Sequence, residues 1–581
     1  MHFPRRPALG DRDPRQPGQP RPASGALSRR ELLRGAGLGL GALYVAGCGG
    51  TSQKLPSSSS QTSAALGSVT VAPGIPGPPA GGGRRGGSIV VAWEAAGNSF
   101  DPALGYDLPS WDSICNCTTA PPMVFGADGQ GPFPNAAASL TPNHDHSVWT
   151  IRFRDGVTFQ NGRPVKAEDY VYSWLRVLDP KLASWASSYL DPIDGAAEVT
   201  AGKARTIRGI RQLDPMTLRI QLTGPDITFP NILAEPYMAA VAREAVERWG
   251  AAFARHVVST GPFTLSSYDA VGQTATFSRN RNYFWTGLPY LDAVIYRWGS
   301  DAQTELLQLQ KGDIDSIGPG IGPTLLPQVS AEPALARYVV KVPELAVRWI
   351  GFNLHQPPFH DPRVRQALNW AADREQISRI SYGAGVPWGL PFPDGLPDYT
   401  RIAPQYTYAP ERARSLLSAA GADRLSFTLT TSSDDPYPSI AQVLQQQLQA
   451  VGVDMSIDTV SDNAYNIATE KKNFAAAVVD WYQVQPTALD ILDSNYVTGG
   501  SANYWNYSNP KVDALAARAL AAANATQSNE YLARAEQLIA QDAPGLFLAS
   551  LDFVDGRNPA LENFHYNIFY GTYYDRLWKR A

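Results

Sequence analysis

The chain has 581 residues, and its 49 Lys and Arg nearly balance its 53 Asp and Glu. It lacks the basic stripe of a nucleic-acid-binding protein, and beyond its first fifty residues it has no apolar run long enough to cross a membrane. Its length exceeds that of one ordinary domain, and an aromatic content of 10% can supply both a large core and an aromatic-lined ligand site.

The first apolar segment has the features of an export signal. It reads SRRELLRGAGLGLGALYVAGCGG over residues 28–50, and its uncharged stretch is too short to span a bilayer. Its start resembles a twin-arginine export signal, and VAGC resembles a lipobox, in which the cysteine becomes the lipid-bearing N-terminus. The alternative is an ordinary secretory signal that holds a cysteine by chance. We therefore expect a signal peptide over residues 1–47 and lipidation of Cys48.

A linker is expected to follow the signal. Residues 48–88 consist mostly of Ser, Gly, Pro, Ala and Thr, with few large apolar side chains. Such a segment cannot offset the entropy lost on ordering, so we expect a flexible tether between the lipid anchor and the folded body.

Cysteine is otherwise rare. Only Cys115 and Cys117 remain, in the segment SICNCTT, and no further Cys or His follows at the spacing of a zinc site. A disulfide that closed so small a ring would be strained. We expect two unpaired, partly buried thiols, with a strained or redox-labile bridge as the alternative.

Hydrophobic periodicity predicts the first clear elements near residue 150. Segment 147–162, SVWTIRFRDGVTFQNG, alternates apolar and polar residues before an Asp-Gly pair, which predicts a β-hairpin. Segment 166–178 is expected to form a helix with one apolar face. That face consists of Val171, Trp174, Leu175 and Leu178.

The second half alternates helix and strand. Asp361 and Pro362 are placed to start a helix over 360–377, and a second helix is expected over 408–422. The next predicted elements are a strand at 425–431, a helix through Ile440 and Leu448, and a strand at 453–457. Strand, helix and strand with short joins form a parallel crossover, so the fold class is α/β, with an antiparallel region early in the chain.

A series of stretches follows one family order through nearly the whole mature chain. It includes WTIRFRDGVTFQNGRPVKAEDYVYSW, STGPFTLSSY, FSRNRNYFWTGLPYLD, LQLQKGDIDSI, GFNLHQPPFHDPRVRQALNWAADRE, YAPERARSLLSAAG and NYSNPKVDAL. Together these stretches resemble the family 5 extracellular solute-binding proteins, the receptors of peptide-type ABC importers. The resemblance implies a type II periplasmic-binding-protein-like fold, with two main lobes, an extra subdomain and a discontinuous first domain.

The resemblance also implies domain boundaries. Lobe I comprises residues 89–122, 258–348 and 546–581, the extra subdomain comprises 123–257, and lobe III comprises 349–545. The chain then crosses between domains near residues 258 and 350, where we expect hinges.

The implied function is solute capture for import. The receptor would be exported, anchored by lipid to the outer face of the cell membrane or periplasmic, and monomeric. It would use no cofactor and bind no nucleic acid. It would close on an oligopeptide or dipeptide and deliver it to the permease and ATPase subunits of an ABC importer.

An oligosaccharide, or a metal or metal chelate, is the alternative cargo. The candidate metal ligands are His144, Asp145 and His146, or His355 with His360. No hydrolase, metalloprotease, P-loop or dinucleotide motif is present, so we do not expect an enzyme.

Six residues are candidate ligand contacts, although each of the aromatic ones would also suit a core. Trp481 and Tyr482 follow a predicted strand in VVDWYQVQP, which matches the family segment that borders the ligand. Trp349 precedes GFN, at the expected crossing between lobes. The full set is Trp93, Trp349, Trp388, Asp480, Trp481 and Tyr482.

One departure from the family pattern concerns charge. In peptide-binding relatives, an aspartate four residues before the proline of this segment accepts the ligand's α-ammonium group. Counting back from Pro486 gives Tyr482, and a shifted register gives Val484, neither of which is charged at neutral pH. Asp480 is a displaced alternative. We therefore expect either a peptide held mainly through its backbone or a neutral, aromatic-friendly solute such as an oligosaccharide.

Overall fold

The computed structural model describes residues 83–126, 129–322, 325–380, 385–396, 399, 401–433, 436–483, 485–564, 566–567 and 570–580. The predicted signal peptide, the lipidation site Cys48 and most of the predicted linker lie outside the described residues. None of the described helices is long and apolar enough to cross a membrane.

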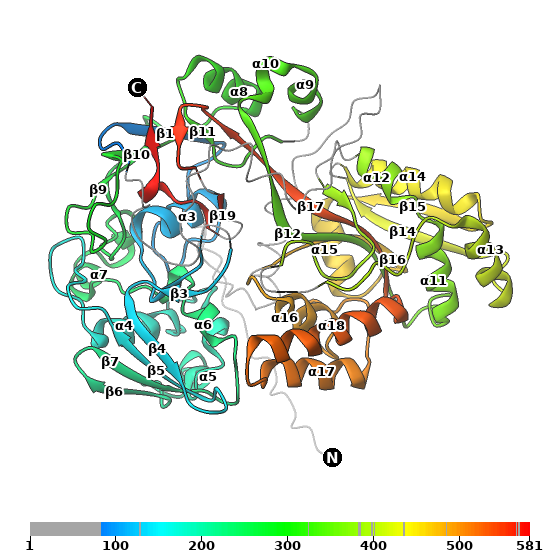
Figure 1. Cartoon of the computed structure of the whole chain (residues 1–581), viewed down its shortest axis with the longest axis horizontal. Coiled ribbons are helices and arrows are strands. Elements are labelled where there is room, and N and C mark those ends of the chain that lie inside the picture. The colour runs from blue at the N-terminus through cyan, green and yellow to red at the C-terminus, as the bar shows by residue number, and fades with distance from the viewer. Residues whose placement is uncertain are drawn as a thin grey trace, which may run out of the picture.

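The described chain forms two lobes that share one large sheet (Figure 1). This 11-stranded sheet has the order β15-β14-β16-β12-β17-β11-β1-β10-β9-β8, with β13 paired to β17. The long strands β12 and β17 run from one lobe into the other. The strands are β1 (Ser88–Trp93), β8 (Phe263–Asp269), β9 (Thr274–Arg279), β10 (Ala293–Trp298), β11 (Ser316–Ile317), β12 (Val339–Phe352), β13 (Gly385–Pro387), β14 (Ser426–Ser432), β15 (Asp454–Val460), β16 (Ala476–Tyr482) and β17 (Gly545–Arg557).

The predicted crossover of the second half is confirmed. Strand β14 pairs with β15 in parallel, and helix α14 (Tyr437–Gln449) connects them. Its buried face includes Ile440 and Leu448, as the spacing of apolar residues predicts.

The predicted helix over 360–377 is two helices. Helix α11 (Pro362–Ala371) begins at Asp361, whose side chain accepts a hydrogen bond of 2.8 Å from the backbone N–H of Arg363. The helix ends at Ala371 and a new one, α12 (Arg374–Ile380), starts after two residues. Helix α13 (Pro410–Ala419) packs beside α11, as expected for the segment 408–422.

The predicted hairpin at 147–162 is wrong. An antiparallel sheet does form here, in the order β4-β5-β7-β6, but β5 pairs with β4 and β7 and not with the residues that follow it. The segment after Gly156 makes only an isolated bridge between Thr158 and Pro164, because both edges of β5 are already occupied. These strands are β4 (Ala137–Pro142), β5 (Val148–Phe153), β6 (Ile210–Asp214) and β7 (Thr217–Gln221).

Helix α4 (Ala167–Val177) confirms the helix expected at 166–178, with its buried face rotated slightly. Tyr170, Trp174 and Val177 are buried, whereas Val171 and Leu175 are only half-buried. Asp169 and Ser173, which share the face of Val177 at four-residue spacing, are also buried.

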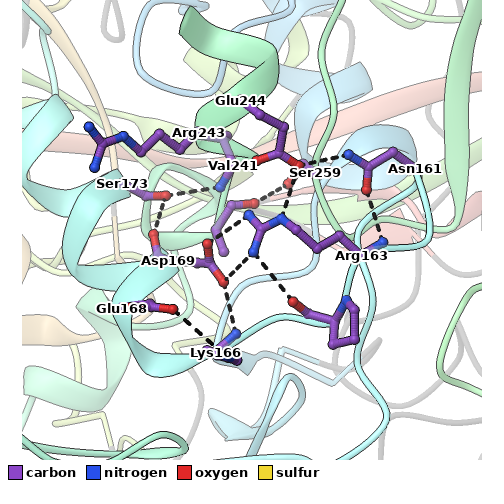
Figure 2. Close-up of polar contacts among 12 residues, drawn as sticks. Asn161, Arg163, Lys166, Glu168, Asp169, Ser173, Val241, Arg243, Glu244 and Ser259 are labelled. Carbon is purple, nitrogen blue, oxygen red and sulfur yellow. Dashed lines mark hydrogen bonds and ion pairs between the residues drawn. The ribbon is translucent and has the colours of Figure 1, made fainter.

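That cluster joins three segments of the first lobe (Figure 2). The carboxylate of Asp169 accepts hydrogen bonds from the backbone N–H of Lys166 at 2.9 Å and from the Arg163 guanidinium at 2.8 and 3.2 Å. Arg163 also donates to Glu244, in helix α7 (Arg243–Trp249), at 2.9 Å. The cluster therefore caps α4 and holds the preceding loop and α7 against it.

The cores follow the lobes. One buried cluster extends from β1 and β10 to the sheet of β4, β5 and β7. In the second lobe, two clusters lie on opposite faces of the sheet. Helices α17 (Pro510–Leu520) and α18 (Ala525–Asp542) cover one face, and α11, α13 and α14 cover the other. The remaining described α-helices are α3 (Leu108–Ser113), α5 (Ala196–Thr200), α6 (Phe229–Ile232), α8 (Ala302–Lys311), α9 (Leu326–Ala331), α10 (Pro333–Ala336), α15 (Asp462–Glu470) and α16 (Ala488–Ile491).

Candidate functional site

The parallel strands of the two lobes end facing one another. In the first lobe, β1 runs parallel to β10 and β11, and β11 runs in the same direction as β12 because both are antiparallel to β17. In the second lobe, β14 runs parallel to β15 and β16, and β16 runs opposite to β12. Ligands of open α/β sheets bind outside the carboxyl ends of the strands. The candidate site therefore lies where β12 and β17 pass between the lobes.

A break in strand pairing marks this place. Pro343 pairs with Asp552 on β17, but the next pair is Val347 with Ser550, so the residues between them bulge out of the ladder. On the other edge of β12, Ala346 pairs with Tyr482 of β16. The strand therefore gains β16 as a second partner at the point where it enters the second lobe, while β17 stays paired to its other edge.

Strand alternation then places a set of side chains together. Leu345 and Val347 point into the core of the second lobe, so Glu344, Ala346 and Arg348 lie on the opposite face of β12. Asp480 and Tyr482 lie beside them, because β16 pairs Asp480 with Arg348 and Tyr482 with Ala346. We call Glu344, Ala346, Arg348, Asp480 and Tyr482 the crossing site.

The charge of Asp480 is already matched inside the crossing site. The guanidinium of Arg348 donates to both of its carboxylate oxygens, at 2.7 and 2.6 Å, and the two side chains are only 7% and 2% exposed. The hydroxyl of Tyr437 donates a third hydrogen bond, at 3.1 Å. A bidentate, buried pair of this kind is a strong and closed interaction, and it leaves Asp480 little negative charge to offer a ligand.

The carboxyl group of Glu344 differs from that of Asp480 in its pKa and in its hydrogen bonds. Burial, followed by the negative charges of Asp480 and Asp552, raises the pKa of its carboxyl group to about 8. No hydrogen bond joins its side chain to any residue that the structure describes, although it is half-buried. Burial also raises the pKa of Asp552 to about 6, an effect that nearby Lys341 opposes.

The floor beside these charges is apolar. Ala346, Ala549 and Leu551 form a small buried cluster that is separate from the two larger cores of this lobe, and Tyr482 packs against it. The pKa of the Tyr482 hydroxyl is raised, chiefly by burial and then by Asp480 and Glu344. The crossing site thus combines a neutral aromatic floor with one unmatched carboxyl group.

Polar groups without partners also lie next to the crossing site at the end of β16. The side-chain amide of Gln483 and the indole N–H of Trp481 are buried, and neither has a hydrogen-bond partner among the residues that the structure describes. The backbone N–H of Gln483 donates to Leu345 at 2.9 Å, which holds this residue beside β12. Alternation along β16 places both side chains on the face opposite to Asp480 and Tyr482, so these atoms are suited to bind water there and do not belong to the crossing site.

The first lobe presents a second unmatched carboxyl group. Glu305, in the first turn of α8, is 0% exposed, and neither of its carboxylate oxygens finds a hydrogen-bond partner within the described part of the chain. Burial, followed by the charges of Glu94 and Asp301, raises its pKa to about 8. Glu94 directly follows β1 and Asp301 caps α8, so both lie at the carboxyl ends of the parallel strands.

The structure brings Asp480 and Tyr482 together at the crossing site, with Trp481 on the opposite face of the same strand. Trp93 and Trp349 lie in cores. Trp93 packs against Tyr296 with ring centroids 5.6 Å apart. Trp349 is 1% exposed and packs edge to face against Trp505 at 5.4 Å.

Trp388 lies at a separate cavity of about 610 Å³ in the second lobe, beside α12 and β13. The guanidinium of Arg401 lies 5.3 Å from the centre of its ring, and its indole N–H donates to the carbonyl oxygen of Phe392 at 2.6 Å. Exposed Tyr408 and Glu375 also line this cavity.

Sequence reasoning missed Glu344 and Arg348. Their signal is two charged residues four apart in PELAVRWIGF, on one face of an otherwise apolar strand. Pairing with β16 could not be predicted, because the partner lies more than a hundred residues later in the chain. Val484, the alternative position for the ammonium partner, lies outside the described residues.

Cys115 and Cys117 are both free, as predicted. His144, His355 and His360 are exposed, and no group of three or more His, Cys, Asp or Glu side chains within the described ranges is arranged to hold a metal ion.

Comparison with known proteins identifies the family. The sequence matches the model of bacterial extracellular solute-binding proteins, family 5 Middle, over residues 131–503. It is 28% identical over 434 residues to the periplasmic oligopeptide-binding protein OppA of Salmonella typhimurium, which covers 72% of this chain and 79% of that protein. It is 26% identical over 492 residues to the glutathione-binding protein GsiB of Escherichia coli O1:K1, which covers 82% and 91%.

Comparison of the three-dimensional structure identifies the fold. The structure superposes on the periplasmic murein tripeptide-binding protein MppA, in its unliganded open form, with a TM-score of 0.77 and 23% identity, covering 85% of this chain and 97% of that one. The type II periplasmic-binding-protein-like fold expected from the sequence is therefore confirmed. The chain belongs to family 5 of the bacterial extracellular solute-binding proteins.

Proposed function

We propose that this protein is the receptor of an ABC importer and captures a peptide between its lobes, at the crossing site. The observation that carries the proposal is the convergence of the carboxyl ends of both sets of parallel strands on one place that holds an aromatic floor and the unmatched carboxyl group of Glu344. The relatives support peptide as cargo, since their names specify oligopeptides, glutathione and a murein tripeptide.

The proposed mechanism is closure without chemistry. The lobes are joined by β12 and β17, so rotation about these strands would bring the carboxyl ends together around the ligand. Binding energy would then stabilise the closed form, which the transporter recognises. The crossing site offers no catalytic pair, because its aspartate is tied to Arg348.

The proposal also includes the attachment of the protein to the membrane and the division of the chain into domains. The protein would be exported, lipid-anchored through Cys48 and monomeric. Its lobe I would comprise 89–122, 258–348 and 546–581, with 123–257 as the extra subdomain and 349–545 as lobe III. The break in strand pairing between Pro343 and Val347 supports a hinge a few residues before residue 350.

The proposal is tested by identifying what the exported protein carries. The protein is purified from producing cells without denaturation, bound molecules are released with acid, and they are analysed by mass spectrometry. We expect short peptides at close to one per protein. Recovery of an oligosaccharide or a metal chelate in that ratio would replace peptide as the cargo.

Two matched variants test where the ligand binds. Tyr482→Ala removes the floor of the crossing site, and Tyr408→Ala removes a tyrosine from the separate cavity. We expect the first variant to lose at least ten times more bound peptide than the second. The reverse order would move the site to the cavity beside α12.

A further inference from the structure

We propose that Glu344, and not Asp480, binds a positively charged group of the ligand. This inference rests on the proposed peptide function and adds its charge preference. It differs from the expectation that follows from the uncharged residues at positions 482 and 484, which is either a peptide held mainly through its backbone or a neutral solute.

The first step of the argument is position. Glu344 lies in the bulge of β12, between the pairs that tie this strand to Asp552 of β17 and to Tyr482 of β16. On its face of the strand, Arg348 lies deepest in the second lobe, Ala346 follows, and Glu344 lies nearest to the first lobe. Its carboxylate is therefore the crossing-site charge that is closest to the space between the two sets of carboxyl ends.

The second step is the charge around it. The groups that face Glu344 from the neighbouring strands are Asp480 and Tyr482 on β16 and Asp552 on β17, and none of them is a cation. On β12 itself, Arg348 directs its guanidinium to Asp480, and Lys341 is coupled to Asp552. Arg348 is paired with Asp480 and Lys341 lies near Asp552, so neither cation matches the carboxyl group of Glu344.

The third step is the fit of a cation. An ammonium or guanidinium group at Glu344 would gain a carboxylate partner and would lie beside the ring of Tyr482, whose face attracts cations. Such a group would also relieve the repulsion between Glu344 and Asp480. The cation has two possible sources in a peptide, the α-ammonium group and a basic side chain.

The test uses three peptide pools of equal length and matched composition. The first has free amino termini and no Lys, Arg or His, the second is the same pool N-acetylated, and the third is N-acetylated but contains one Lys or Arg per peptide. Each is equilibrated with the purified exported protein, and retained peptide is measured by native mass spectrometry. The variants are Glu344→Gln, Glu344→Asp, Asp480→Asn and the control Glu375→Gln, which removes an exposed carboxylate at the separate cavity.

We expect the unmodified protein and Glu375→Gln to retain either the pool with free amino termini or the acetylated basic pool at least tenfold better than the acetylated pool without basic residues. Preference for the first would identify the α-ammonium group as the bound cation, and preference for the basic pool would identify a basic side chain. In Glu344→Gln the preference should fall below twofold, while Glu344→Asp should keep part of it. An undiminished preference in Glu344→Gln would overturn the inference, and a separate loss of preference in Asp480→Asn would assign the role to Asp480.

The experiment distinguishes an error in the role of Glu344 from an error in the proposed peptide function. If the unmodified protein retains all three pools equally, peptide capture stands and the role of Glu344 is wrong. If it retains none of them, the peptide function itself is wrong, and the assignment of Glu344 is overturned with it. Melting temperatures of the variants, measured in parallel, confirm that each is folded.

Discussion

Arg348 matches the charge of one carboxyl group of the crossing site, that of Asp480, and leaves the other without a cationic partner. It holds Asp480 through two short hydrogen bonds in a place where both side chains are almost fully buried. Removing one partner of such a pair leaves a buried charge unmatched. The pair therefore ties β12 to β16 and satisfies the charge of Asp480 within the protein.

The variant Arg348→Met should lower the free energy of unfolding by about 3–5 kcal/mol, since it strands the Asp480 carboxylate. The double variant Arg348→Met/Asp480→Leu should recover most of that loss. Denaturant unfolding measures both, and the exposed pair Arg243–Glu247 provides the control, where Arg243→Met should have little effect. A single and a double variant of equal stability would show that the pair is not tightly coupled.

The pH dependence of stability reports on Glu344. Its carboxyl group has an ordinary pKa of 4.5, which the fold raises to about 8. Between these values the folded protein binds more protons than the unfolded chain, so this group lowers the free energy of unfolding as pH rises. Glu344→Gln should therefore gain stability relative to the ligand-free unmodified protein as pH rises from 5 to 8.

Thermal unfolding at several pH values measures this difference, and the comparison is repeated in an Asp552→Asn background because the charges of Asp552 and Glu344 interact. Melting curves of the two proteins that shift in parallel from pH 5 to 8 would mean that the fold does not raise the pKa of Glu344.

Cys48 carries the proposed anchor. Cys48→Ala should move the exported protein from the membrane fraction to the soluble fraction, because two or more acyl chains are needed for stable attachment. Cell fractionation with an immunoblot measures this, and Cys115→Ala is the control. A Cys48→Ala protein that remains in the membrane fraction would place the anchor elsewhere.

At the scale of elements, local signals predict structure where an element is specified by its own residues. Asp361 and Pro362 start α11 as expected, and the apolar spacing of α14 gives its buried face. The hairpin at 147–162 was mispredicted because β5 takes its partners from residues 137–142 and 217–221. The crossing site escaped prediction for the same reason, since it depends on the pairing of β12 with β16.

The start of α4 offers a test of one such element. Asp169 caps the helix and binds Arg163, and its side chain is only 6% exposed (Figure 2). Asp169→Ala should lower the free energy of unfolding by about 3 kcal/mol, because the helix start and a partly buried arginine both lose their partner. Glu244→Ala, which removes the more exposed partner of Arg163, should cost much less. Equal costs in denaturant unfolding would contradict this account of the cluster.

At the scale of the whole molecule, two lobes that share one sheet can move only by bending the strands between them. β12 and β17 make these connections, and a further contact lies away from them, where the N–H of Ile227 donates to the carbonyl oxygen of Leu520 at 3.0 Å. Bending at the crossing site would change the distance between the carboxyl ends while leaving both cores intact.

The central claim is that a peptide is enclosed between the lobes and released unchanged. Small-angle X-ray scattering of the ligand-free protein and of the protein saturated with its co-purified peptide tests this most directly, with the peptide recovered afterwards and weighed by mass spectrometry. We predict a smaller radius of gyration on saturation and recovery of the intact peptide. An unchanged radius together with a cleaved peptide would contradict the account and indicate an enzyme.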